Sequence, residues 1–118
     1  MKALLIDDSI LIRRMEATNL GELGCSEIIH ATDGIDGLKK LAENMPVDII
    51  LLDINMPNMD GMTALRTIRA DARYSDVKIF MVTSESEKTT VLEALRAGAN
   101  DYIVKPFSSD EFKMRLGI

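Results

Sequence analysis

The 118-residue chain has only one cysteine, one histidine and no long apolar run. It therefore lacks the features of a disulfide-rich or membrane-spanning protein. Cys25 cannot form an internal disulfide, and we interpret it as a buried or inert thiol. No stretch approaches the roughly 18 apolar residues of a membrane span. The apolar run near the N-terminus is too short for the core of a signal peptide. We therefore expect a cytoplasmic protein without a membrane partner.

An excess of basic residues is also missing. The chain has 14 Lys and Arg against 19 Asp and Glu, for a net charge of −5. Without a basic stripe to contact phosphates, direct binding of nucleic acid by this domain is not expected. The length fits one domain over residues 1–118, and an apolar fraction of 47% is sufficient for a core without disulfides or a structural metal.

The sequence contains no low-complexity segment and no linker; instead, short apolar runs alternate with helical patterns. The runs are continuous in Ile, Leu and Val, which is typical of strands buried on both faces of a parallel sheet. We predict strands at residues 3–6, 28–31, 49–52, 79–82 and 102–104.

Helical periodicity fills the segments between these runs. The first helix should start near Ser9 and be closed by Gly24, Asp33 should N-cap the second, and Gly98 should end the fourth. The last helix should be short, at about residues 109–116. The side chains expected on the buried faces are Leu11, Ile12, Met15, Leu20 and Leu23, then Ile35, Leu38, Leu41 and Ala42, then Met62, Leu65 and Ile68, and finally Val91, Leu92 and Leu95.

Five strand–helix units at this spacing predict an α/β fold, with a parallel sheet, right-handed crossovers and helices on both faces. In an open doubly wound sheet, ligands bind beyond the carboxyl ends of the strands. Asp7 and Asp8 follow the first predicted strand, Asp53 the third, Thr83 the fourth and Lys105 the fifth. These side chains are therefore expected to meet at one edge.

Three carboxylates at one edge repel each other by several kcal/mol at an effective dielectric constant of about 20. A cation would relieve that repulsion, and oxygen ligands without His or Cys favour Mg²⁺ over Zn²⁺. A carboxylate can also attack phosphorus and form an acyl phosphate. Lys105 could then neutralise a phosphoryl oxygen and the Thr83 hydroxyl could donate to one. Together these residues suit phosphoryl transfer to an aspartate.

Each of these signals is weak alone. Asp8 or Ser9 could serve only as a helix N-cap, and Thr83-Ser84 could be a turn. His30 is interpreted as a half-buried strand residue without a role. The strength of the prediction comes from the combination, because every residue lies at the same end of its strand.

Longer motifs resemble one known family. They are Asp7-Asp8-Ser9, then Asp53-Ile54-Asn55-Met56-Pro57-Asn58-Met59-Asp60-Gly61, then Thr83-Ser84-Glu85, Ala97-Gly98-Ala99 and Tyr102-Ile103-Val104-Lys105-Pro106-Phe107. The whole chain resembles bacterial response-regulator receiver domains, most closely the stand-alone chemotaxis type. That resemblance implies a flavodoxin-like five-stranded sheet in the order 2-1-3-4-5.

The resemblance also assigns roles around the metal. It implies that Asp53 is the phospho-acceptor and a Mg²⁺ ligand, that Asp8 is a direct ligand, and that Asp7 holds the ion, often through water. The backbone carbonyl of Asn55 would be a further ligand. Mn²⁺ is a possible substitute for Mg²⁺.

Other matches describe a switch. By resemblance, Thr83 moves toward the phosphoryl group, Lys105 pairs with it, and Tyr102 rotates inward in response. Pro106 would follow a cis peptide bond. The surface that changes would comprise the fourth helix, the fifth strand and the fifth helix. Asn55 and Glu85 flank the expected path of water to the acyl phosphate, so we expect them to tune dephosphorylation, measurable as decay after the phosphodonor is removed.

The function implied is a two-component signalling switch, not an enzyme proper, although it would catalyse its own phosphotransfer and dephosphorylation. Its partners would be a sensor histidine kinase and a downstream target, either a flagellar switch or an output domain. Only 11 residues follow Phe107. An N-terminal receiver of a multidomain regulator, with DNA-binding or cyclase output, is therefore the alternative.

Two enzyme-like classes fit less well. A dehalogenase-type phosphotransferase carries Asp-x-Asp after its first strand, whereas Asp7 and Asp8 are adjacent here. A nucleotide-binding Rossmann protein would need Gly-x-Gly-x-x-Gly after that strand, and this motif is missing.

Overall fold

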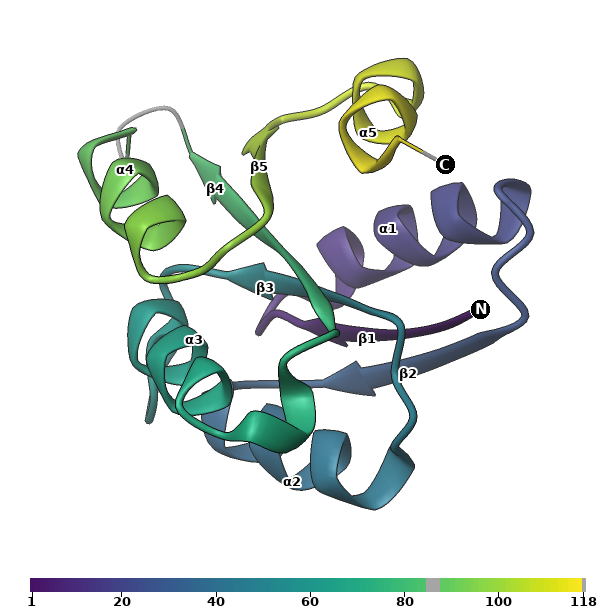
Figure 1. Cartoon of the computed structure of the whole chain (residues 1–118). Coiled ribbons are helices and arrows are strands. Elements are labelled where there is room, and N and C mark those ends of the chain that lie inside the picture. The colour runs from purple at the N-terminus through teal and green to yellow at the C-terminus, as the bar shows by residue number, and fades with distance from the viewer. Residues whose placement is uncertain (85–87, 118) are drawn as a thin grey trace.

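The structure, a computed structural model, describes residues 1–84 and 88–117. Strands and helices alternate along the chain, with one short 3₁₀ turn (Figure 1). Their bounds are β1 Lys2–Ile6, α1 Ile10–Glu22, β2 Glu27–Ala31, α2 Gly34–Asn44, β3 Ile49–Asp53, α3 Gly61–Arg69, η1 Ala72–Tyr74, β4 Lys78–Ser84, α4 Lys88–Arg96, β5 Asp101–Lys105 and α5 Ser109–Leu116. Each predicted strand is present and is extended by one to three residues.

The sheet has the order β2-β1-β3-β4-β5, and every neighbouring pair is parallel. Helices α1 and α5 lie on one face, while α2, α3 and α4 cover the other (Figure 1). The predicted doubly wound α/β fold is therefore confirmed. Because β1 and β3 are neighbours, their carboxyl ends lie side by side, with β4 next to β3.

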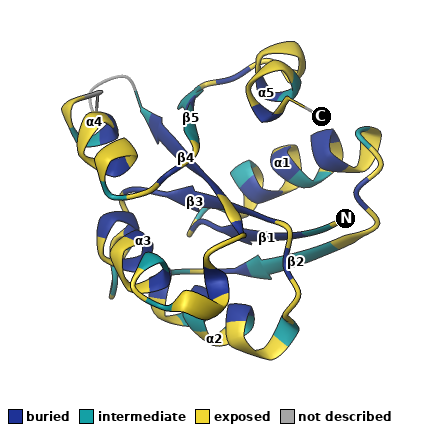
Figure 2. Cartoon of the chain, viewed as in Figure 1, coloured by how far each residue is buried: buried dark blue, intermediate teal, exposed yellow. Residues whose placement is uncertain are grey.

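Two hydrophobic cores fill the space on the two sides of the sheet, and the strands supply both. Alternate residues point to opposite faces, so Leu4 and Ile6 join the core with α2, α3 and α4, while Ala3 and Leu5 join the core with α1 and α5. All five residues of β3 are buried (Figure 2). This double burial explains why the strand sequences are apolar throughout and do not alternate.

Side-chain caps begin the helices at the positions that connect to the strand ends. The Ser9 Oγ accepts from the Ile12 N–H at 3.2 Å, and the Asp33 carboxylate accepts from the Asp36 N–H at 2.8 Å. The Asp33 cap and the start of the first helix near Ser9 were predicted. Gly24 and Gly98, which follow α1 and α4, have positive φ angles of 90° and 112°. Glycine adopts this left-handed conformation without the usual steric cost.

The predicted buried face of α1 is largely wrong. Leu11 is 67% and Met15 37% exposed, and Ile12 and Leu23 are only partly buried; of the predicted set, only Leu20 is fully buried. The other side chains that α1 buries are polar: Arg13, Glu16 and Asn19. The cap at Ser9 fixes where the helix starts, and the helix then turns a polar stripe toward the sheet instead of the apolar stripe beside it.

Parts of the α2 and α4 predictions are also wrong. Ile35 is 55% exposed and Ala42 is exposed, while Leu41 is buried as predicted and Leu38 partly so. Two glycines are buried in α2, and a Cβ on Gly37 would lie 2.5 Å from the Ile6 Cδ1. In α4, Leu92 and Leu95 are exposed, and the short side chain of Ala94 is buried beside Val91. All three predicted positions of α3 are buried.

Cys25 is buried and free, and His30 is partly buried, both as predicted. Among residues 1–84 and 88–117, no helix combines the length and the apolar composition needed to cross a bilayer.

Candidate functional site

Three carboxylates meet at the carboxyl edge of the sheet. Asp53 is the last residue of β3, and Asp7 and Asp8 follow β1. One oxygen from each lies within 4.8 Å of the other two. Asp7 and Asp53 are buried and Asp8 is exposed, so the cluster opens to solvent on one side.

The cap of α1 explains how the two adjacent aspartates are placed. Ser9, and not Asp8, caps the helix, so the capping alternative for Asp8 is excluded. The Ser9 N–H donates to the Asp7 Oδ1 at 2.8 Å and fixes that carboxylate. Asp8 remains at the open side of the cluster, where it can bind a cation.

Lys105 reaches the same cluster from β5. Its Nζ lies 3.0 Å from the Asp53 Oδ1 and 3.2 Å from the Asp7 Oδ2. The side chain passes the carboxyl end of β4, which lies between β3 and β5. The predicted cis peptide bond between Lys105 and Pro106 is present. The ammonium group thus bridges the two buried acids.

Burial dominates the electrostatics of the cluster. It raises the pKa of Asp53 to about 6, with a further rise caused by the Asp7 charge and a partial reversal by Lys105. Burial also raises the pKa of Asp7, against the hydrogen bond from Ser9 and the charge of Lys105. Burial alone would lower the pKa of Lys105, but its hydrogen bonds and attraction to Asp53 and Asp7 raise it overall. An added cation would favour the ionised carboxylates.

The donor set fits a hard divalent cation. It consists of carboxylate oxygens, and His and Cys do not take part. Mg²⁺ takes a few carboxylates and keeps several waters, which the open side at Asp8 could admit. Asn55 is exposed and lies two residues past Asp53, in the loop of residues 54–60. A bound divalent ion would offset the repulsion that Lys105 only partly relieves.

Two of the predicted switch residues, Thr83 and Tyr102, lie on β4 and β5, on the opposite side of β3 from β1. Thr83 is buried near the end of β4, and its hydroxyl donates to the Ser84 carbonyl at 3.2 Å. Thr83 and Tyr102 line a shared cavity of about 240 Å³ together with Val91, Leu92, Leu95 and Val104. The cavity is thus bounded by β4, α4 and β5. Glu85 lies outside the described residues.

Sequence reasoning did not identify two features of the site. A Cβ on Gly61 would lie only 2.1 Å from the Asp53 carbonyl oxygen, so glycine is required where α3 begins behind the acceptor. The Asp60-Gly61 pair was the available signal for this close approach. Glu16 was missed because it lies in a helix that was expected to bury apolar residues, yet it is only 1% exposed. Burial raises its pKa, and the charges of Asp7, Lys105 and Asp53 also act on it.

Comparison with known proteins identifies the family that uses this arrangement. Residues 3–116 match the family described as the response regulator receiver domain. This chain belongs to that family. As a receiver domain it is a signalling module and not a dedicated enzyme, and receiver domains typically bind Mg²⁺.

Individual receivers are similar over almost their whole length. The chain is 37% identical to the chemotaxis protein CheY1 of Helicobacter pylori over 118 residues, covering all of this chain and 95% of that protein. It is 40% identical to a CheY homolog of Campylobacter jejuni over 116 residues, covering 98% and 89%. The structure of Vibrio cholerae CheY4 superposes with a TM-score of 0.88 at 34% identity, covering 98% and 95%.

Proposed function

We propose that this receiver accepts a phosphoryl group on Asp53 from a sensor histidine kinase in a Mg²⁺-dependent reaction. The observation that carries the proposal is the placement of a buried Asp53 carboxylate 3.0 Å from the Lys105 Nζ and within reach of Asp7 and Asp8. A nucleophile, a fixed cation and a set of metal ligands are thereby gathered at one end of the sheet.

In the proposed transfer, a carboxylate oxygen of Asp53 attacks the phosphorus of a phosphohistidine. The new P–O bond forms as the P–N bond breaks, and the imidazole leaves with the electron pair of that bond. The product is an acyl phosphate on Asp53. The rate depends on positioning and on neutralising charge, since phosphoryl transfer needs little other help from a protein.

Each neighbouring residue has a task in this reaction. Asp8, Asp7, Asp53 and the Asn55 carbonyl would hold Mg²⁺, which supplies charge neutralisation at the phosphoryl oxygens. Lys105 exchanges one carboxylate contact for a phosphoryl oxygen, and the Thr83 hydroxyl turns from the Ser84 carbonyl to donate to another. Asn55 and Glu85 tune the later attack of water on the acyl phosphate.

The output is a shift between two arrangements of the Thr83 loop. Phosphorylation adds contacts to Thr83 and Lys105 in only one of them, and this difference moves the equilibrium. Tyr102 shares a cavity with Thr83, so the surface of α4, β5 and α5 responds. We propose that the chain is a chemotaxis-type regulator that acts in the cytoplasm on a flagellar switch. The support is that the relatives in Helicobacter pylori and Campylobacter jejuni are chemotaxis proteins, and that this chain aligns with them over nearly their full length.

The deciding experiment incubates the chain with acetyl phosphate and Mg²⁺ and measures the mass of the intact protein. The wild type should gain one phosphoryl group, and Asp53→Asn should gain none, because the amide is a poor nucleophile. Transfer from a phosphorylated histidine kinase domain should show the same difference.

Two controls make the result specific. Chelation of Mg²⁺ should abolish labelling of the wild type, and Asp48→Asn, which changes an exposed aspartate at the opposite end of the sheet, should label normally. Labelled Asp53→Asn would overturn the acceptor assignment.

A further inference from the structure

The loop of residues 54–60, which joins β3 to α3, is tied to the start of α2 by contacts that phosphoryl chemistry does not require. The Asn58 Nδ2 donates to the Asp33 Oδ2 at 2.7 Å. The Gly34 N–H donates to the Met59 carbonyl at 3.3 Å. These contacts bridge 25 positions in sequence and attach the loop that contains Asn55 to a separate helix.

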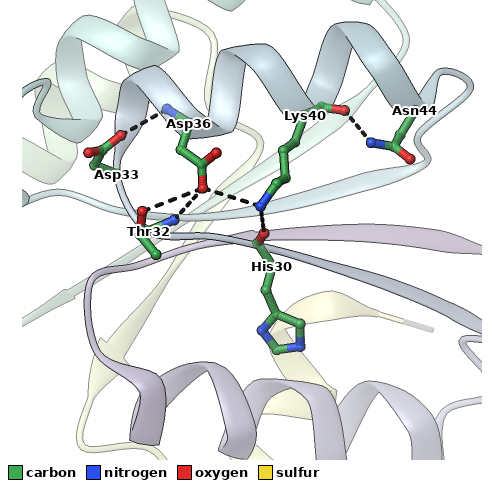
Figure 3. Close-up of polar contacts among 6 residues, drawn as sticks. All are labelled: His30, Thr32, Asp33, Asp36, Lys40 and Asn44. Atoms are coloured by element: carbon green, nitrogen blue, oxygen red, sulfur yellow. Dashed lines mark hydrogen bonds and ion pairs between the residues drawn. The ribbon is translucent and has the colours of Figure 1, made fainter.

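Asp33 is a rigid attachment point because its other oxygen is already engaged. The Asp33 Oδ1 accepts from the Asp36 N–H at 2.8 Å and so caps α2. Asp36 in turn accepts from the Thr32 N–H at 3.0 Å and from the Lys40 Nζ at 3.3 Å (Figure 3). Lys40 also donates to the His30 carbonyl at 2.7 Å, which joins the cap to strand β2. These bonds fix where the Asp33 carboxylate lies.

Asn58 is held in an unusual backbone conformation. It has φ of 67°, and it is the one non-glycine residue with positive φ among residues 1–84 and 88–117. Asparagine tolerates this region better than most residues, but such a conformation persists only when its surroundings enforce it. The bond to Asp33 is a contact that enforces it.

Glycines fix the two sides of the loop at close range. A Cβ on Gly34 would lie 2.8 Å from the Met59 carbonyl oxygen, so the start of α2 packs directly on the loop. At the far end, the Gly61 N–H donates to the Ile54 carbonyl at 2.8 Å. The backbone between Ile54 and Gly61 is thus closed on itself, and its outer part is tied to α2.

We propose that Asp33 and Asn58 form a latch that positions the Asn55 backbone for Mg²⁺. The two residues need not touch the ion; they act through the loop and are positioning residues. This inference rests on the proposed function, in which the Asn55 carbonyl is a ligand. Residues that orient metal ligands from outside the coordination shell commonly change affinity when they are replaced.

A residue swap tests the latch. Asp33→Ser removes the carboxylate oxygen that accepts from Asn58 while keeping a good N-cap. An amide at position 33 alone would not break the bond, because a flipped Asn58 amide could accept from it. Combining Asp33→Asn with Asn58→Asp restores a donor and an acceptor with their roles reversed and leaves the net charge unchanged. Asn58→Gly removes the side chain but permits the positive φ.

The readout is the Mg²⁺ dissociation constant of the unphosphorylated chain, measured by isothermal titration calorimetry. Loss of one hydrogen bond should weaken Mg²⁺ binding about two- to tenfold in Asp33→Ser and in Asn58→Gly. The swapped pair should recover most of the affinity. Asn44→Ala is the matched control, because it removes an asparagine bond of 2.7 Å to the Lys40 carbonyl at the other end of α2 (Figure 3).

The outcomes separate this inference from the proposed function. Wild-type affinity in both single variants, or no recovery in the swapped pair, would overturn the latch alone. A wild type that does not bind Mg²⁺ would overturn the proposed metal site itself. Urea unfolding of each variant without metal shows whether a change in affinity merely follows a loss of stability.

Discussion

Glu16 places a carboxyl group in the interior, on the face of α1 that packs against the sheet. The residue is 1% exposed, and its Oε1 has no hydrogen-bond partner among the described residues. Burial raises its pKa well above the usual value, and the charges of Asp7 and Asp53 add to the effect, against Lys105 and Arg13. The folded protein therefore favours the neutral acid at this position.

A dependence of stability on pH follows. An acid whose pKa is higher in the folded protein than in the unfolded chain binds more protons when folded, so the free energy of unfolding falls as the pH rises from the unfolded pKa toward the folded one. Above about pH 4.5, Glu16 should progressively destabilise the protein. Glu16→Gln stays neutral and should raise the free energy of unfolding at pH 8 by on the order of 1 kcal/mol, with little change at pH 4.

Urea unfolding between pH 4 and pH 8 in metal-free buffer measures this difference. Asp53 and Asp7 also have raised pKa values, so the variant should keep part of the wild-type slope. Glu22→Gln is the control, because Glu22 lies half exposed at the end of the same helix. Equal slopes in the wild type and Glu16→Gln would contradict the assignment of a neutral buried acid.

At the scale of single elements, helix α5 is joined to its neighbouring strand β5 by one arginine. The Arg115 guanidinium on α5 lies 4.8 Å from the centroid of the Tyr102 ring on β5. Its Nη1 lies 3.5 Å from the Asp101 Oδ1. A second arginine–tyrosine pair, Arg73 over Tyr74 at 5.1 Å, lies elsewhere in the chain.

Removal of Arg115 should loosen the Tyr102 ring. A cation over an exposed aromatic ring contributes about 0.5–1 kcal/mol, which corresponds to a two- to fivefold change in the population of ring positions. The chain has no tryptophan, so in a Tyr74→Phe background the fluorescence comes from Tyr102 alone. Acrylamide should quench this emission more strongly after Arg115→Gln.

Arg73→Gln in that background is the matched control, since it removes the other cation–ring contact and should leave the quenching of Tyr102 unchanged. Equal quenching with and without Arg115 would show that the contact does not restrain the ring.

The elements themselves differ in how far they could be predicted. Strands and α3 were predictable because most of their buried positions are hydrophobic, and the buried polar exceptions, Asp53 and Thr83, lie near the strand ends. Helix α1 was not, because Glu16 is buried near charged residues that follow or end distant strands, and the local sequence pattern does not contain that information. In α2, glycine occupies two of the three buried positions, because Met59 and Ile6 approach the helix closely at Gly34 and Gly37, and Ile35 is exposed.

For the whole molecule, the site could be predicted because the topology converts sequence order into proximity. Four of the five strands have a polar residue of the site at or just after their carboxyl end, and parallel strands bring these ends to one edge. The latch could not be found this way. The sequence contains Asp33 and Asn58, but their contact depends on where α2 packs against the loop after β3, and on a positive φ that asparagine only permits.

Gathering three acids at one edge should make global stability depend on Mg²⁺. An ion that binds the folded state and not the unfolded chain stabilises by RT ln(1 + [L]/Kd), which is about 1.4 kcal/mol when the free Mg²⁺ concentration is ten times Kd. For a domain of 118 residues this should raise the Tm by about 5 °C.

Thermal unfolding with and without Mg²⁺, at constant ionic strength set with NaCl, measures this rise in Tm. Asp8→Ala should keep the fold, because Ser9 and not Asp8 caps α1. It should lose most of the rise in Tm caused by Mg²⁺, because the solvent-exposed carboxylate of the cluster has been removed. Its Tm without metal should equal or exceed that of the wild type, since one of three repelling carboxylates has been removed. An equal Mg²⁺ increment in Asp8→Ala and the wild type would place the ion elsewhere on the molecule, because a site at this edge requires the carboxylate that remains open to solvent.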